Sequence, residues 1–269
     1  MAEIPTGNVS YGDGETALAN EILRTTVGSG VHGIAIEGSD DLDLMGVFIE
    51  PRENVYGLGP ALDHYISRTQ PEGVRSRPGD VDLVIYSLRK YLRLAIKGNP
   101  TALLPLFAPE SDIVTQTKLG ASLRDMRTLF LSQEAVWRFL GYMHQQHERM
   151  LGGGKRNRVP NRPELVEKYG FDVKYAAHAL RLAMQGYEIA TTGHLSLPMV
   201  ICDRDLVLAV KRGEVDQEEI YEQVTYFERE IRHILESGQC SLPAAPFTPV
   251  LSSWSVTAHE THWRSGRRQ

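Results

Sequence analysis

The segment Gly28–Ile49 reads GSGVHGIAIEGSDDLDLMGVFI and decides the fold of the first half of this 269-residue chain. It opens on a glycine-punctuated turn, and its last seven residues, from Asp43, predict a short buried strand that Glu50-Pro51 closes. Because side chains alternate along a strand, the carboxylates of Asp41 and Asp43 are expected on one face. Two adjacent carboxylates offer the oxygen ligands that a hard divalent cation prefers.

A third carboxylate lies in the second strong strand candidate, Val81–Tyr86, which is mostly apolar and β-branched. Asp82 lies within this strand, and Asp80 precedes it by two residues on the same predicted face, so either acid is a candidate third ligand. An acid on a neighbouring strand would complete a second cation site. Two cations can then clamp the attacking hydroxyl and the leaving pyrophosphate of an in-line displacement.

The remaining pattern predicts an α/β first half followed by a helical second half. Residues 17–27 begin helical and become strand-like, and the polar residues 68–79 predict a loop or hairpin tip. Apolar residues recur every three to four positions in five further segments, which predicts a helix in each: 88–96, 101–107, 132–150, 173–185 and 216–236. Residues 237–269, rich in Pro, Ser and Thr, predict an irregular tail; its His259-Glu-Thr-His262 lacks the zincin spacing.

Composition indicates a globular protein, with 42% hydrophobic and 23% charged residues. The first 14 residues lack the pattern of a signal peptide, no apolar run is long enough for a membrane span, and Cys202 and Cys240 are too few for a disulfide framework. These features predict a cytoplasmic protein without a membrane partner. The net charge of −5 argues against a protein that coats nucleic acid non-specifically.

Charge is nevertheless uneven, because residues 149–181 contain eight Lys or Arg against three acids. This stretch is either a surface that faces a polyanion or an ordinary solvated face. Within it, Lys174, His178 and Arg181 are spaced four and three residues apart and share one predicted helix face. That face is either a site for triphosphate or RNA or a solvated stripe.

The order of these motifs resembles a known family. Gly28-Ser29, then Asp41-Leu42-Asp43, then an Asp within a strand are similar to the signature of the DNA polymerase β-type nucleotidyltransferase superfamily. The resemblance covers residues 22–215 and narrows to an RNA-repair-associated predicted nucleotidyltransferase family of bacteria and phages. The narrowing motifs are Asp43-x-x-Gly46-Val47, Tyr86-Ser-Leu-Arg-Lys90, Gly98-Asn99-Pro100, Lys168-Tyr-Gly-Phe-Asp-Val-Lys174 and His178-x-x-Arg181.

The resemblance implies an α+β fold, in which a small mixed β-sheet nucleotidyltransferase core with flanking helices precedes a helical C-terminal region. We therefore expect a catalytic domain at 1–115, a helical domain at 116–240 and a tail at 241–269. The implied reaction moves a nucleoside monophosphate from an NTP to a hydroxyl acceptor, an RNA or tRNA end, in a bacterial or phage-infected cell, and releases pyrophosphate. It depends on two Mg²⁺ ions, for which Mn²⁺ is a substitute.

The resemblance also implies a role for each site residue. Asp41 and Asp43 hold both metals, and Asp82, favoured over Asp80 by the family's spacing, ligates the catalytic metal. Gly28, Ser29, Lys90, Lys174, His178 and Arg181 bind the nucleotide. For Gly28-Ser29 the alternative is a simple turn, and Lys90 is alternatively a brace of the core. Two other functions remain open: a non-catalytic nucleotide- or RNA-binding protein on this scaffold, and a toxin-like enzyme that nucleotidylates tRNA or protein.

Overall fold

The computed structural model describes residues 7–36, 38, 41–150 and 162–266. They form two compact units that alternate along the chain. The first comprises the described residues within Met1–Ile96, Thr101–Phe130 and Phe247–Gln269, and the second those within Lys97–Pro100 and Leu131–Pro246. The domain limits expected at residues 115 and 240 stay predictions.

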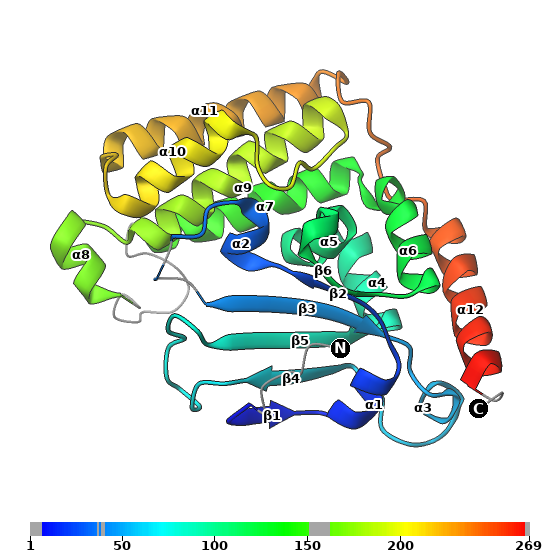
Figure 1. Cartoon of the computed structure of the whole chain (residues 1–269). Helices are drawn as coiled ribbons and strands as arrows, with labels where there is room; N and C mark the ends of the chain where they lie inside the picture. The colour runs from blue at the N-terminus through cyan, green and yellow to red at the C-terminus, as the bar shows by residue number, and fades with distance from the viewer. Residues whose placement is uncertain (1–6, 37, 39–40, 151–161, 267–269) are drawn as a thin grey trace. The chain divides into compact units, whose positions relative to one another are not determined.

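The first unit is built on a six-stranded sheet with the strand order β1-β4-β5-β3-β2-β6 (Figure 1). β3 and β5 are parallel, and the other neighbouring pairs are antiparallel, which confirms the predicted α+β fold with a mixed sheet. The strands predicted from Asp43 and from Val81 correspond to β3 and β5. The strands are β1 (Val9–Tyr11), β2 (Glu21–Thr26), β3 (Leu42–Phe48), β4 (His64–Arg68), β5 (Val81–Ser87) and β6 (Ile113–Gln116).

The helices of the first unit are mostly short. The segment 28–33, expected as a turn, contains one helical turn that ends at Gly33 in the left-handed conformation. The apolar stripe expected after Ser87 is confirmed, because Leu88, Tyr91, Leu92 and Ala95 are buried. The helices are α1 (Gly14–Ala19), α2 (Gly28–His32), α3 (Arg52–Tyr56), α4 (Leu88–Ile96), α5 (Pro100–Phe107, whose first residue belongs to the second unit), α6 (Lys118–Asp125), α12 (Thr248–Ser265) and the 3₁₀ turns Glu110–Asp112 and Arg127–Phe130.

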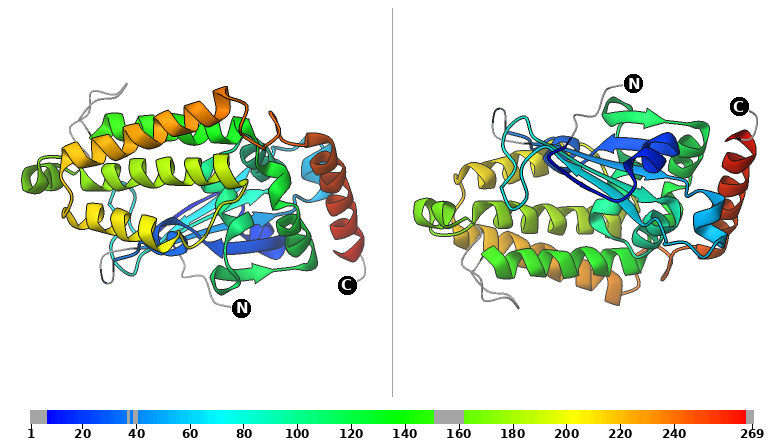
Figure 2. Two further views of the ribbon diagram at one scale, coloured as in Figure 1. Left: turned by 90° about the horizontal axis from the view of Figure 1, so that it is seen from above. Right: turned by 90° about the horizontal axis from the view of Figure 1, so that it is seen from below.

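The second unit is helical, as predicted, and is centred on α9 (Val173–Thr192), which packs against α7, α10 and α11 (Figure 2). Small residues allow this close packing: a Cβ on Gly186 would lie 3.3 Å from both Phe139 and Ile231. None of the described helices is long and apolar enough to cross a membrane. The other helices are α7 (Gln133–Met150), α8 (Pro163–Tyr169), α10 (Ile201–Arg212) and α11 (Gln217–Glu236).

The prediction of an irregular tail is wrong, because α12 is an 18-residue helix that packs against α4. Its serines, threonines and valines have low intrinsic helix propensity, so tertiary contacts stabilise it instead. Trp254 Nε1 donates to Ser122 Oγ at 3.0 Å, and Trp263 Nε1 donates to the Glu50 carbonyl at 2.9 Å. The two histidines noted in the sequence also anchor the helix: His259 Nε2 lies 3.2 Å from Glu50 Oε2, and His262 Nε2 lies 2.8 Å from Asn20 Oδ1.

Candidate metal centre

Strand register brings the acidic side chains together. β3 and β5 are parallel neighbours, and Asp43 pairs directly with Asp82, so the two side chains lie side by side on one face. Asp41 lies two residues before Asp43 and therefore shares this face. Each of the three offers one carboxylate oxygen, and these oxygens all lie within 4.8 Å of one another. All three residues are partly buried.

Asp80 is occupied elsewhere. Its Oδ1 accepts a hydrogen bond from Thr69 Oγ1 at 3.0 Å, and its Oδ2 accepts one from the Arg77 N–H at 2.7 Å. These bonds brace the hairpin loop between β4 and β5. The geometry therefore makes Asp82, and not Asp80, the third carboxylate of the group.

Gly28 fits closely against this group. Its φ is +67°, in the region where a side chain is strained, and a Cβ added there would collide with Asp43 Oδ2. The neighbouring Val27 N–H donates to the Asp43 carbonyl at 2.9 Å, which ties the start of α2 to β3. Val27, the N-cap residue of α2, makes no side-chain capping hydrogen bond. The phosphate-binding role of Gly28 and Ser29 stays a prediction.

Two polar residues that the sequence did not single out hold Asp82 in place. Gln70 Nε2 donates to Asp82 Oδ1 at 2.8 Å, and Ser76 Oγ donates to Asp82 Oδ2 at 3.1 Å. Arg68 Nε lies 3.7 Å from Asp82 Oδ1. The sequence could not reveal these contacts, because Gln70 and Ser76 lie in a polar loop whose path over β5 depends on the folded hairpin.

These residues fit a divalent cation. Three like charges within 4.8 Å repel one another in the absence of a counter-charge, and carboxylate oxygens are the ligands that Mg²⁺ and Mn²⁺ prefer. Gln70 adds a second indication: it is only 7% exposed, and its Oε1 is buried without a hydrogen-bond partner among the described residues. A metal-bound water is a suitable donor to this oxygen.

We predict that Gln70→Leu raises the metal concentration needed for half-maximal activity by about 10- to 100-fold, because it frees the Asp82 carboxylate to rotate. The measurement is a Mg²⁺ titration of initial rates. Rescue at high Mg²⁺, with an unchanged thermal midpoint in EDTA, would identify Gln70 as a positioning residue. An unchanged titration curve would contradict this role.

Lys90 is not brought to the carboxylates. It lies on α4, which begins directly after the last residue of β5, whereas Asp82 is the second residue of that strand. The five strand positions from Asp82 to Ser87 span about 17 Å. Its Nζ lies 3.5 Å from Asp63 Oδ2, in a partly exposed ion pair. Nucleotide binding by Lys90 and its alternative role as a brace of the core both stay predictions.

Lys174, His178 and Arg181 lie on α9 in the second unit. Packing of the imidazole among other groups lowers the pKa of His178, and the nearby Arg181, Arg162, Lys211 and Lys174 cations lower it further. His178 is exposed over part of its surface, and this cationic surrounding by itself favours the neutral ring. Arg181 donates to Gln185 Oε1 at 2.8 Å. The positive field suits an anion, and nucleotide binding by these residues stays a prediction. Three further basic residues of the 149–181 stretch, Lys155, Arg156 and Arg158, lie outside the described residues.

Three comparisons relate this chain to known proteins. A family model described as the RNA repair pathway DNA polymerase beta family matches residues 15–236. An uncharacterized 38.9 kDa protein from the nrdC-mobD intergenic region of Enterobacteria phage T4 is 24% identical over 127 residues, which cover 46% of this chain and 37% of that protein. The match thus spans just over a third of the relative's length. A nucleotidyltransferase-like protein from Exiguobacterium sibiricum 255-15, known from a crystal structure, has 13% identity and a TM-score of 0.29, over 82% of this chain and 71% of that one.

Proposed function

Since this chain belongs to the RNA repair pathway DNA polymerase beta family, we propose that it is a nucleotidyltransferase that acts on an RNA end, with tRNA included among its acceptors. It moves a nucleoside monophosphate from an NTP to a hydroxyl and releases pyrophosphate. The observation that carries the proposal is the convergence of Asp41, Asp43 and Asp82 within 4.8 Å, beside a glycine that a larger residue cannot replace without a collision.

The chemistry follows from the positions of these side chains. Two bound divalent cations would supply charge for the attacking and leaving oxygens. Asp41, Asp43 and Asp82 would hold them, and Asp82 would also orient the acceptor hydroxyl and accept its proton. The hydroxyl oxygen bonds to the α-phosphorus as the bond from that phosphorus to the bridging oxygen breaks, and the electron pair leaves with pyrophosphate. Gln70 and Ser76 fix Asp82 in the orientation that this step requires.

The basic residues around His178 have a separate task in this proposal. Lys174 and Arg181 bind the phosphates of the NTP or of the RNA, and the neutral imidazole of His178 offers a hydrogen bond. The support is local: the charged groups that shift the pKa of His178 are all cations. An anion bound there would relieve their mutual repulsion.

The direct test incubates the protein with each NTP, labelled on the α-phosphate, in the presence of Mg²⁺ or Mn²⁺ and total RNA. We expect label on RNA, a preference among the four NTPs, and complete loss of transfer when EDTA removes the metal. Tight RNA binding without transfer to any acceptor would favour a non-catalytic binding protein. Label on protein, or growth arrest accompanied by labelled host tRNA, would favour a toxin-like enzyme.

A further inference from the structure

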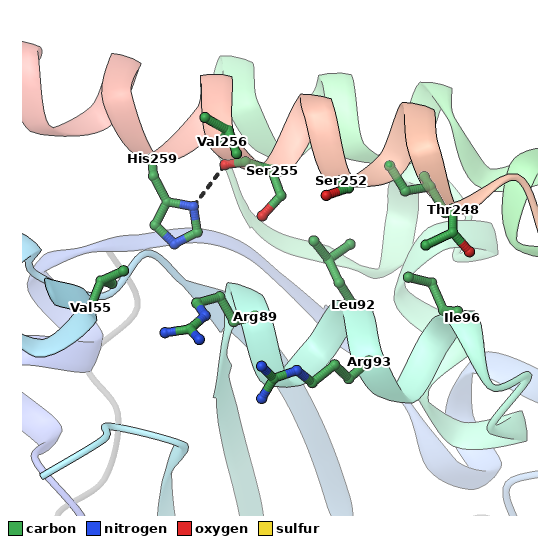
Figure 3. A pocket seen from close by; sticks show the side chains of 11 residues that line it. Val55, Arg89, Leu92, Arg93, Ile96, Thr248, Ser252, Ser255, Val256 and His259 are labelled. Carbon is green, nitrogen blue, oxygen red and sulfur yellow. Dashed lines mark hydrogen bonds between the residues drawn. The ribbon is translucent and has the colours of Figure 1, made fainter.

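A pocket of about 320 Å³ lies between α4 and α12 in the first unit (Figure 3). Its walls combine three kinds of side chain. Leu92 and Ile96 of α4 form an apolar wall, and Ser252 and Ser255 of α12 bring hydroxyl groups. Arg89 and Arg93 line the side formed by α4, as Figure 3 shows. Its volume lies at the lower end of the range for small-ligand sites, and it is open to solvent.

The two arginines leave positive charge uncompensated. They are four residues apart and so share one face of α4. Within the described part of the chain, neither has a hydrogen bond or an ion pair, and both are exposed. Three acids of the first unit have partners of their own, because Asp63 pairs with Lys90, Glu260 with Arg264, and Glu50 with His259, while Glu53 of α3 is exposed. The pocket therefore favours an anion, and paired guanidinium groups suit phosphate.

Aromatic side chains continue this surface. Val55 of α3 lines the pocket, and the next residue, Tyr56, is 69% exposed. Tyr56 packs edge-on against Trp263, with ring centroids 5.7 Å apart. The Arg52 guanidinium carbon lies 5.9 Å from the Tyr56 ring centroid and 6.0 Å from that of Trp263, so it helps to hold both rings. His259, which lines the pocket, packs against Trp263 with ring centroids 5.4 Å apart, so Trp263 connects Tyr56 to the pocket. An exposed ring connected in this way to a pocket with unpaired arginines offers stacking and phosphate contacts on one surface, which is how proteins bind single-stranded nucleic acid.

This surface is separate from the metal centre. Both lie in the first unit, but α4 begins where β5 ends, whereas Asp82 lies near the start of β5. Asp82 and the last residue of β5 are about 17 Å apart along the strand. A ligand bound here is therefore not the nucleotide whose α-phosphate meets the three carboxylates.

We propose that the surface formed by Arg89, Arg93 and Tyr56 binds a single-stranded segment of RNA. Phosphates contact the two arginines at the pocket mouth, and a base stacks on Tyr56. The proposal rests on the proposed function in taking RNA as the acceptor. It gives that RNA a contact remote from the reacting hydroxyl.

The test measures binding without catalysis. Fluorescence anisotropy follows a labelled single-stranded RNA of about 12 nucleotides at several salt concentrations, in EDTA and without NTP. For Arg89→Gln combined with Arg93→Gln, we expect about tenfold weaker binding and a salt slope smaller by about 1.4, because two phosphate contacts are lost. Tyr56→Ala should weaken binding about fivefold or more, and Tyr56→Phe should restore it.

A matched control removes two charges elsewhere on the same unit, with Lys118→Gln and Arg127→Gln, both exposed. Equal weakening by the control pair, or an unchanged Kd and slope in the arginine pair, would overturn the proposal. So would arginine-dependent binding of a free mononucleotide as tight as that of the RNA. Asp41→Asn combined with Asp43→Asn should still bind the RNA at least as tightly as wild type. A failure of the catalytic proposal can therefore be distinguished from a failure of the RNA-binding proposal.

Discussion

The Asp82→Asn protein should transfer nucleotide about 10³-fold more slowly than wild type, or worse, which corresponds to about 4 kcal/mol of lost transition-state stabilisation. Asp82 provides one of three oxygens within 4.8 Å of one another. Asparagine keeps the size of the side chain but removes the charge and the base that the proposed mechanism requires to hold a cation and accept the proton. Steady-state rates with labelled NTP and a defined RNA acceptor measure the effect.

Asp80→Asn is the matched control, because it removes the same charge two residues away. Asp80 accepts bonds from Thr69 and Arg77 and is not part of the carboxylate group. Its replacement costs one or two loop hydrogen bonds, so we expect the rate to fall by less than about tenfold. A larger loss in Asp80→Asn than in Asp82→Asn would reverse the assignment of the third ligand.

Thermal unfolding checks the same site without relying on activity. Mg²⁺ should raise the melting temperature of wild type, because a ligand that binds only the folded state stabilises it. Asp43→Asn combined with Asp82→Asn should abolish this shift. In EDTA the same double variant should melt near the wild-type temperature, because the lost repulsion among the three carboxylates offsets the weaker contacts of residue 82 with Gln70, Ser76 and Arg68. A Mg²⁺ shift that persists in the double variant would place the cation elsewhere.

The sequence predicted those elements whose pattern is local. β3 and β5 are short apolar runs bounded by turn residues, and α4 has a clear apolar stripe. Alternation of side chains along a strand predicted the pairing of Asp41 with Asp43, and Asp82 stood out because an acid within an apolar strand is costly to bury without a partner. The parallel pairing that sets Asp43 against Asp82 is a long-range property, and the family resemblance implied the mixed sheet that supplies it.

Two features escaped prediction because long-range contacts create them. α12 lacks a strong helical pattern, and partners such as Ser122 and Glu50, far away in the sequence, anchor it. Gln70 lies in a loop that looks ordinary until the β4–β5 hairpin folds it over Asp82. Lys90 shows the converse, since its place within a family motif suggested proximity to the nucleotide, whereas the direction of β5 carries it to the other end of the sheet.

Gly28→Ala is expected to impair both folding and catalysis. The left-handed backbone at Gly28 costs a non-glycine residue about 1–2 kcal/mol. The added methyl group would also collide with Asp43 Oδ2, so either α2 or the carboxylate must move. We expect the free energy of unfolding to fall by about 2–3 kcal/mol, and turnover of the folded fraction to fall about 10²-fold, because a displacement of about 1 Å is enough to misplace a reacting group.

Gly30→Ala separates this effect from a general intolerance of α2. Gly30 has no positive φ, and its added Cβ would meet only the Thr26 methyl group, at 3.2 Å. Alanine favours a helix by up to about 1 kcal/mol over glycine, which offsets that close contact, so stability should change by less than about 1 kcal/mol. Urea unfolding and Mg²⁺ titration of the rate measure both variants. If Gly28→Ala matched Gly30→Ala in both the free energy of unfolding and the Mg²⁺ dependence of the rate, the close approach of α2 to Asp43 would have no part in shaping the metal centre.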